Sequence, residues 1–410
     1  MKNNKKHIVI ISTWYPPLKH VAVPRIEAFS KYLDKDKFDV TVVTLSVDES
    51  IEEINEKGVD VIRLGNKSLF KLPDFNKQTS KPVHYAKVLW KLFVLRVTAD
   101  EYKGWAKDVG SFLTKLHQTK EIDLVISSSA PLTPHKIAFD FCKSHSSIKW
   151  VADLRDELST RIGASSLVRK KSEEIEGLIN KRADAFLSVS KPIVDDFKTL
   201  LSNVKESEEI RNGYNHDVKF SSYEFNKQFT IGYFGTFYSP NKPDLFFECM
   251  EELQQEKILP DDWMIQFVGT PKNFTIPPFL KNNIEFIPKK SYADVIKLAR
   301  ACDINLLVLN FAERLGVYSG KLFDYISVRK PILALVNKND VAAKLIKEVN
   351  AGYIAEGEDK KDVKKQIMLA ISNWKSKTQL MMNTDKINLL HRKHQVKKLE
   401  ILIDKLLANK

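Results

Sequence analysis

The sequence predicts an α/β protein built from two doubly wound parallel sheets in series, and three observations carry this prediction. Short apolar runs rich in Val and Ile alternate with longer segments of helical periodicity. The runs are apolar throughout, which is typical of parallel strands covered by helices on both faces. The alternation is broken by one polar stretch, residues 212–227, and then starts again. Two α/β units joined by a linker follow from this pattern.

The predicted strands are separated by segments long enough to hold a helix. They span 7–11, 40–45, 60–64, 123–127, 149–152 and 185–189 in the first unit, and 229–234, 264–268, 304–309 and 331–336 in the second. Residues 212–227 carry an Asn-Gly turn signal and lack either period, so the linker is placed there. The segment 387–407 has apolar residues at nearly helical spacing and predicts one long helix that packs an apolar stripe against a neighbour.

Composition and charge narrow the class of protein. The chain has 410 residues, 43% hydrophobic and 29% charged, as in a globular protein of several domains. A formal net charge of +13 favours an anionic partner, but no groove-reading motif accompanies it, so nucleic acid is not expected. The first apolar run is too short for a signal peptide, and no run has the length of a spanning helix. We expect a cytoplasmic protein, either soluble or peripheral to a membrane.

The second unit contains a strand-to-helix junction typical of a phosphate site. The predicted strand 229–234 is followed by Gly235 and Thr236, and Lys242 stands just before the next helix. A glycine there lets a ligand approach the backbone, and a helix N-terminus with a lysine favours a phosphate. The alternative is that Gly and Pro residues of this segment only punctuate a turn.

A second junction of the same kind follows the strand 304–309. Ser319 and Gly320 would present free backbone N–H groups and Lys321 a positive charge, with Asp324 one turn into the helix. A carboxylate at that distance can hold a ribose diol while the helix end holds a diphosphate. The alternative is that Ser319 caps the helix and Asp324 lies favourably in its first turn.

Charged residues also follow two strands of the first unit. Asp153, Arg155 and Asp156 come directly after the apolar run 149–152, at the carboxyl edge of the sheet where substrates are met. His135 similarly stands at a helix start after the run 123–127. The alternatives are a structural Asp–Arg ion pair and a histidine that serves only as a structural partner.

Residues 77–120 are basic and rich in aromatic residues. They contain nine Lys or Arg against three acids, around a helical patch that includes Trp90 and Phe93. Such a patch suits an anionic membrane surface. The alternative is a helix packed on its own domain with its lysines in solvent.

Taken together, four stretches resemble a known family, the retaining, nucleotide-sugar-dependent GT-B glycosyltransferases that build bacterial surface polysaccharides. The stretches occur in the family's order and span most of the chain. They are residues 15–17 with Arg25, residues 127–135 leading into 150–156, residues 233–236, and residues 320–325 followed by 330–332. The resemblance implies two Rossmann-like domains that face each other across a cleft. It assigns 1–212 to acceptor binding, 229–382 to binding of the nucleotide sugar, and 383–410 to a helix that returns to the first domain.

The resemblance also implies roles for individual residues. On the donor side, Asp324 would contact the ribose, and the diphosphate would be surrounded by Gly235, Thr236, Lys242, Ser319, Gly320 and Lys321. On the other side, Arg25 would belong to the acceptor site, and the reacting sugar would be met by His135, Asp153, Arg155 and Asp156. Lysines and a helix N-terminus can stabilise the charge of the leaving diphosphate, so no metal ion or other cofactor is required. The predicted partners are a nucleotide-sugar donor and a glycan or lipid-linked acceptor.

Three departures from the family pattern keep other functions open. The loop after the first strand, residues 18–24, has no glycine; Gly316 stands where many members have Glu; and Thr236 stands where many have Arg. One alternative is a nucleotide-sugar epimerase on the same two-domain plan, since a fold does not fix a function. The other is a non-catalytic scaffold that binds a sugar nucleotide without turnover.

Overall fold

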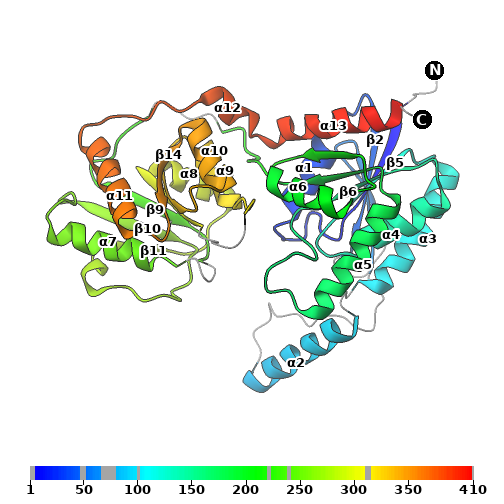
Figure 1. Ribbon diagram of the computed structural model, residues 1–410, viewed down its shortest axis with the longest axis horizontal. Coiled ribbons are helices and arrows are strands. Elements are labelled where there is room, and N and C mark those ends of the chain that lie inside the picture. The colour runs from blue at the N-terminus through cyan, green and yellow to red at the C-terminus, as the bar shows by residue number, and fades with distance from the viewer. Residues whose placement is uncertain are drawn as a thin grey trace. The chain divides into compact units, whose positions relative to one another are not determined.

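The computed structural model describes residues 5–46, 52–65, 80–98, 102–218, 223–237, 242–309 and 315–408. The chain forms two compact units (Figure 1). Unit 1 consists of Met1–Arg211 and Arg392–Lys410, and unit 2 of Asn212–His391. Each unit contains one twisted sheet with helices on both faces, so the predicted α/β class is confirmed.

The sheet of unit 1 has the order β3-β4-β2-β1-β5-β6-β7-β8. Its strands are β1 (Lys6–Ile11), β2 (Phe38–Leu45), β3 (Glu52–Glu56), β4 (Val59–Leu64), β5 (Leu124–Ser128), β6 (Lys149–Asp153), β7 (Ala185–Ser188) and β8 (Glu206–Glu209). Neighbouring strands are parallel except β3, which pairs antiparallel with β4. The strand order reverses between β1 and β5. Doubly wound sheets bind ligands at the carboxyl ends of the strands beside such a reversal.

Helices cover both faces of this sheet because successive side chains of each strand point to opposite sides. Val9 and Ile11 of β1 pack in one core, and Ile8 and Ile10 pack in the other. The first core is covered by α3 (Lys103–Thr119), α4 (Thr133–Ser144), α5 (Ser166–Arg182) and α6 (Lys191–Leu200). The second is covered by α1 (Val23–Tyr32) and α13 (Arg392–Ala408). In a further helix, α2 (Lys81–Thr98), none of the described side chains packs in either core.

The sheet of unit 2 has the order β11-β10-β9-β12-β13-β14, the doubly wound order of a dinucleotide-binding fold. Its strands are β9 (Phe229–Phe234), β10 (Trp263–Val268), β11 (Ile284–Ile287), β12 (Ile304–Leu309), β13 (Ile332–Val336) and β14 (Gly352–Glu356). One face is covered by α7 (Asp244–Gln255) and α11 (Lys360–Lys375), next to a 3₁₀ turn at Pro278–Leu280. The other is covered by α8 (Tyr292–Ala301), α9 (Gly320–Ser327), α10 (Val341–Val349) and α12 (Thr384–Leu389).

The predicted single helix over 387–407 is two helices. Helix α12 ends at Leu389, and α13 begins at Arg392 after a break at Leu390 and His391. Ile387 and Leu390 pack in the core of unit 2, whereas Val396, Leu399 and Ile403 pack in the core of unit 1. The break thus falls between the residues that pack in unit 2 and those that pack in unit 1. The return of the C-terminal helix to the first unit is confirmed by α13.

Candidate functional site

A pocket of about 360 Å³ lies in unit 2 at the carboxyl ends of β9, β10 and β11, between helices α8 and α9. This is the sheet edge at which doubly wound folds bind their ligands. Four of the predicted donor-site residues line it: Gly235, Thr236, Lys321 and Asp324. The other lining residues are Phe234, Val268, Gly269, Lys289, Lys290, Val295, Ile296, Ala299 and Tyr325.

Lys321 is a cation of this pocket that is largely removed from water. Its Nζ donates hydrogen bonds to the Tyr233 hydroxyl at 2.7 Å and to the Thr236 carbonyl oxygen at 3.0 Å. The Tyr233 ring also lies against the ammonium, with its centroid 4.3 Å from Nζ. No carboxylate pairs with the Nζ in the part of the chain that the structure describes. Burial lowers the pKa of Lys321 to about 8, so an anion would find a charge that is only partly compensated.

Gly235 supplies the backbone conformation that this arrangement needs. Its φ is +99°, in a region that residues with a Cβ rarely adopt. A Cβ at this position would also come within 3.1 Å of the Lys321 Cε. Hydrogen bonds hold the residue on both sides, from its N–H to the Val268 carbonyl at 2.8 Å and from the Thr270 hydroxyl to its carbonyl at 2.7 Å. The glycine therefore lets the lysine lie directly beneath the turn after β9.

Asp324 meets a residue that the sequence analysis did not single out. The Tyr292 hydroxyl donates to Asp324 Oδ1 at 2.6 Å. Tyr292 is the first residue of α8, where the Ser291 side chain accepts from the Asp294 N–H at 3.2 Å and caps the helix. A carboxylate and a half-exposed phenol thus stand together at the pocket rim. Both groups can hydrogen-bond a vicinal diol.

Lys289 and Lys290 also line the pocket and were not predicted. They follow β11, and both are exposed. The signal available in the sequence was a basic pair just before a Ser-Tyr helix start, the same strand–turn–helix pattern used for the other junctions. With Lys321 they bring three lysines to one pocket, against the single carboxylate Asp324 among its lining residues. The pocket therefore favours a ligand with several negative charges.

The remaining donor-site predictions lie outside the pocket lining. Lys242 is exposed before α7. Ser319 caps α9 by accepting from the Lys321 N–H at 3.3 Å, and Gly320 is the exposed first residue of that helix.

Gly316 has a φ of +91° and donates its N–H to Asp340 Oδ1 at 2.6 Å, so this backbone would strain a glutamate. The loss of a glutamate at Gly316 allows a shifted role for Glu313 or Arg314, and both lie outside the described residues.

In unit 1 the structure brings Arg25 and Asp153 together as a buried ion pair. The Arg25 Nη2 lies 2.7 Å from Asp153 Oδ1, and Nε lies 3.1 Å from each carboxylate oxygen. Their side chains are 3% and 0% exposed. Asp153 also accepts from the Ser128 hydroxyl at 2.7 Å, and Arg25 Nη1 donates to the Ile210 carbonyl at 2.6 Å. These contacts tie α1, β5, β6 and the end of β8 to one point at the carboxyl edge of the sheet.

His135 is fully buried at the start of α4, and its Nδ1 is hydrogen-bonded to Ser127, which in turn contacts Trp150. The Trp150 Nε1–H donates to Ser127 Oγ at 2.8 Å, which leaves the Ser127 hydroxyl proton for His135 Nδ1, also at 2.8 Å. A hydroxyl can also accept a second hydrogen bond, so these contacts allow both tautomers; when Nδ1 accepts, the proton of the neutral ring lies on Nε2. Nε2 is buried and has no hydrogen-bond partner among the described residues. With that tautomer, His135 can act as a hydrogen-bond donor at Nε2.

This burial has a testable consequence for stability. Desolvation lowers the pKa of His135 to about 4, against 6.5 for a free side chain. Between those values the unfolded chain binds more protons than the folded one, so the contribution of His135 is fully present above pH 6.5 and is lost as pH falls towards 4. We expect His135→Gln to flatten this part of the stability curve, measured by urea unfolding at a series of pH values. His145→Gln is the matched control at the far end of α4, and an equal flattening there would contradict the expectation.

Arg155 and Asp156 lie at the same edge but are not in the ion pair. Arg155 Nη2 donates to the Val21 carbonyl at 3.3 Å, and its Nε is buried with no hydrogen-bond partner in the described part of the chain. Burial, with Arg25 nearby, lowers the pKa of Arg155. Asp156 is exposed. The glycine-free loop after β1 is thus anchored by Arg155, and also by the Trp14–His20 ring stack, whose centroids are 4.5 Å apart.

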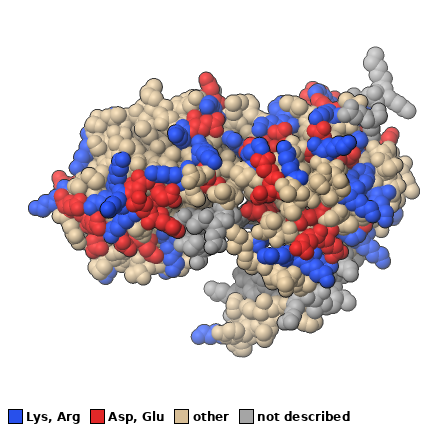
Figure 2. All heavy atoms as spheres, viewed as in Figure 1, with Lys and Arg blue, Asp and Glu red and all other residues tan. Residues whose placement is uncertain are grey.

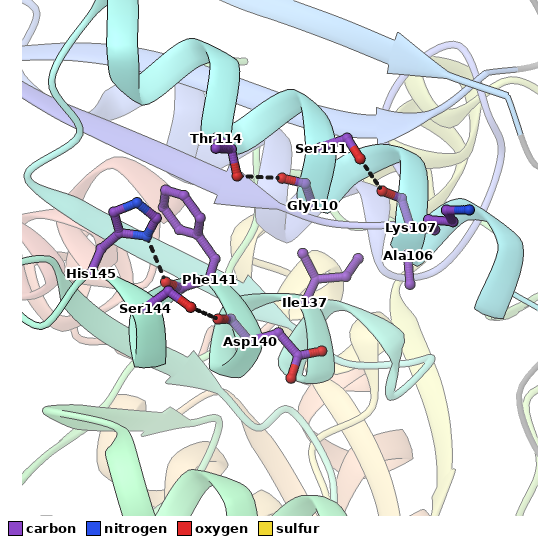
Figure 3. Close-up of a pocket in the computed structure, with 10 residues that line it drawn as sticks. All are labelled: Ala106, Lys107, Gly110, Ser111, Thr114, Ile137, Asp140, Phe141, Ser144 and His145. Carbon is purple, nitrogen blue, oxygen red and sulfur yellow. Dashed lines mark hydrogen bonds between the residues drawn. The ribbon is translucent and has the colours of Figure 1, made fainter.

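A second cavity, of about 400 Å³, lies in unit 1 between α3 and α4 (Figure 3). Its polar side chains bond to backbone of their own helices, as Thr114 does to Gly110 and His145 to Phe141. Asp140 pairs with Lys136 on the surface. No convergent set of groups faces this cavity, so it is not the candidate site.

Within the described ranges, no group of three or more His, Cys, Asp and Glu side chains could hold a metal ion.

The chain is similar to known proteins in its structure, but no similarity to them was found in its sequence. No protein-family model and no curated protein sequence matches it. Among solved structures, sucrose-phosphate synthase from Thermosynechococcus elongatus matches with 10% identity and a TM-score of 0.66, over 99% of this chain and 100% of that one. A trehalose-phosphate synthase (UDP-forming) from Burkholderia xenovorans, in complex with glucose-6-phosphate, matches with 11% identity and a TM-score of 0.62, over 98% and 100%.

A third match is HepE from Anabaena in complex with UDP and glucose, with 13% identity and a TM-score of 0.57 over 98% of this chain and 99% of that one. At such identities the likeness concerns the fold. It confirms the predicted GT-B architecture of two Rossmann-like units over essentially the whole chain.

Proposed function

We propose that this protein is a glycosyltransferase that moves a sugar from a nucleotide diphosphate donor to a glycan or lipid-linked acceptor, in surface polysaccharide biosynthesis. The observation that carries the proposal is the desolvated Lys321 beneath Gly235, in a pocket that also holds Asp324. The fold supports it, because solved structures with this fold include synthases named as UDP-forming and one protein in complex with UDP and glucose.

The chemistry assigned to the pocket is stabilisation of the leaving diphosphate. Breaking the bond between sugar and diphosphate leaves negative charge on the phosphate oxygens, and fixed cations in a dry site lower the barrier to that step. Lys321 would supply the buried cation, with Lys289 and Lys290 at the rim. Asp324 and Tyr292 would hold the ribose diol. Lysines can supply this charge without a metal ion, and we infer the retaining stereochemistry that the sequence motifs suggest.

We assign acceptor binding and the contacts to the reacting sugar to the carboxyl edge of the unit 1 sheet. Among the described residues, Nε2 of His135 and Nε of Arg155 are buried without a hydrogen-bond partner, and a sugar hydroxyl or phosphate could satisfy them. Asp156 is the exposed carboxylate there. A lipid-linked acceptor would place the protein at the inner face of the plasma membrane.

Thermal stabilisation by nucleotides tests the donor site directly. A ligand that binds only the folded state raises the melting temperature, by an amount equivalent to about 2.7 kcal/mol at 100 times its Kd. We expect one of UDP, GDP, ADP, TDP and CMP to stabilise the protein selectively, with the shift lost in Asp324→Ala. Tyr292→Phe should retain most of it, because the carboxylate remains. No shift with any nucleotide would contradict the proposal.

Assays of donor turnover then distinguish glycosyl transfer from the two alternatives, epimerisation and binding without catalysis. The corresponding nucleotide sugar should be consumed only when an acceptor fraction is present. Conversion of the donor without an acceptor would indicate an epimerase instead. Binding without any turnover would indicate the non-catalytic scaffold, which the Thr236 and Gly316 departures left open.

A further inference from the structure

Most of the large apolar side chains that the structure describes in helix α2 are exposed. On a surface helix the apolar stripe normally faces the core. Here Tyr85 and Leu89 are each 67% exposed, and Leu92 is 58% exposed. Val83, Trp90 and Phe93 are exposed as well, and the last two rings lie 5.5 Å apart. In Figure 1 the helix projects from the rest of unit 1.

Helical spacing places these residues on one side of α2. At about 100° per residue, Val83, Tyr85, Leu89, Trp90, Leu92 and Phe93 occupy roughly half of the circumference. The half-buried residues Lys87 and Val88 lie in the other half. The large apolar side is thus the side directed outwards, and it includes one Trp and one Tyr, the residues favoured at membrane interfaces.

The charge of α2 identifies what this face would meet. Its sequence contains Lys81, Lys87, Lys91 and Arg96 and no Asp or Glu. Figure 2 shows the described part of this helix as mostly uncharged on the face drawn. An apolar face on a helix with basic and no acidic residues fits a surface that is both apolar and anionic, because acyl chains take the apolar side chains and anionic headgroups take the basic ones.

The structure also divides the basic stretch 77–120 into two parts. In α3 the aromatic and aliphatic residues point inwards, since Trp105, Val109 and Leu113 are fully buried in the core of unit 1. Tyr102, just before α3, is buried as well. Within the described part of this stretch, the exposed large apolar side chains all lie on α2, so the predicted surface reduces there to this helix.

We propose that α2 is a membrane-docking helix that lies in the headgroup region of an anionic bilayer with its outward apolar face inserted. Among the described residues no helix is long and apolar enough to span a bilayer, and α2 carries too much charge along its length to do so. It would therefore lie along the surface. The proposal concerns a different surface from the nucleotide pocket and does not rest on sugar transfer.

Co-sedimentation of the full chain with vesicles tests this proposal. We expect binding to phosphatidylcholine vesicles that contain about one third phosphatidylglycerol, and much weaker binding to phosphatidylcholine alone. The reason is that binding needs both insertion of the apolar side chains and attraction of the basic ones to anionic lipid. Trp90→Glu with Phe93→Glu should weaken binding at least about tenfold, since two large side chains no longer enter the bilayer. Ile401→Glu is the matched control, an apolar residue 70% exposed on α13, and it should bind like the parent.

Several results would overturn the proposal. One is that the parent fails to bind anionic vesicles although circular dichroism shows it folded. Another is that the double variant binds as well as the parent or no worse than the control. A third is that the lipid-free parent sediments as a dimer that the double variant does not form, because α2 would then contact a second copy of the chain. None of these results depends on nucleotide, so they leave the proposed function standing.

Discussion

Asp153→Ala is expected to destabilise unit 1 by about 3–5 kcal/mol, because it leaves the Arg25 guanidinium buried without its counter-charge. Among the described residues, Arg25 would keep its hydrogen bond to the Ile210 carbonyl and its contact with the Phe29 ring. The measurement is hydrogen exchange of the full chain, which reports on the amides of β1, β5 and β6 separately from those of unit 2. Protection should fall in unit 1 and stay unchanged in β9 and β10.

Two further variants give this prediction its controls. Asp156→Ala removes an exposed carboxylate three residues away and should change stability by less than about 0.5 kcal/mol. Arg25→Met with Asp153→Leu removes both charges and should recover much of the lost stability, since replacing a buried pair by apolar groups is often close to neutral. If Asp153→Ala keeps its stability and loses only transfer activity, the catalytic role predicted from the sequence would be favoured instead.

Lys321→Met is expected to weaken binding of the preferred nucleoside diphosphate by about 10- to 100-fold, as for the loss of roughly 1.5–3 kcal/mol in hydrogen bonds to a charged group. Methionine preserves most of the buried stem, so stability should change little by comparison. Isothermal titration calorimetry measures the effect. Lys344→Met, an exposed lysine of α10, is the control and should bind like the parent.

The same binding should depend on pH in a defined direction. Burial lowers the pKa of Lys321 to about 8, and a diphosphate binds the protonated form. Affinity should therefore be constant well below pH 8 and fall as pH rises through 8, by at most about tenfold per pH unit for one proton. The fall should be absent in Lys321→Met. A parent whose affinity is unchanged from pH 7 to pH 9 would contradict the role of Lys321.

Lys242 separates two interpretations of the donor site. The sequence motif assigns it to the diphosphate, whereas it lies exposed before α7 and outside the pocket lining. Equal losses in Lys242→Met and Lys321→Met would support the motif. A loss only in Lys321→Met would restrict the phosphate contacts to the pocket described above.

The predicted strands and the missed strands differ in one respect. All strands inside the two sheets correspond to apolar runs that the sequence makes visible. The strands β3, β8, β11 and β14 were not predicted, and each lies at a sheet edge. An edge strand has one neighbour and is less completely covered by helices, so it needs no continuous apolar run. β3 shows this most clearly, since all its residues are exposed.

The candidate site shows a similar division. Gly235, Thr236, Lys321 and Asp324 were predicted because each stands at a strand-to-helix junction, and the order of parallel strands brings such junctions to one edge. Tyr292 was missed, because its contact with Asp324 joins residues 32 positions apart on two helices. No local pattern encodes such a pairing.

By itself the sequence determined the class of this protein: two parallel α/β units, their order, and which junctions face the carboxyl edges of the sheets. These features follow from local periodicity and from the fixed handedness of parallel connections. The tertiary structure decided what each charged residue does there. It paired Arg25 with Asp153, desolvated Lys321, placed His135 against Ser127 and Trp150, and exposed the described apolar side chains of α2. Burial and partners set the energy of a charge, and both depend on which distant segments pack around it.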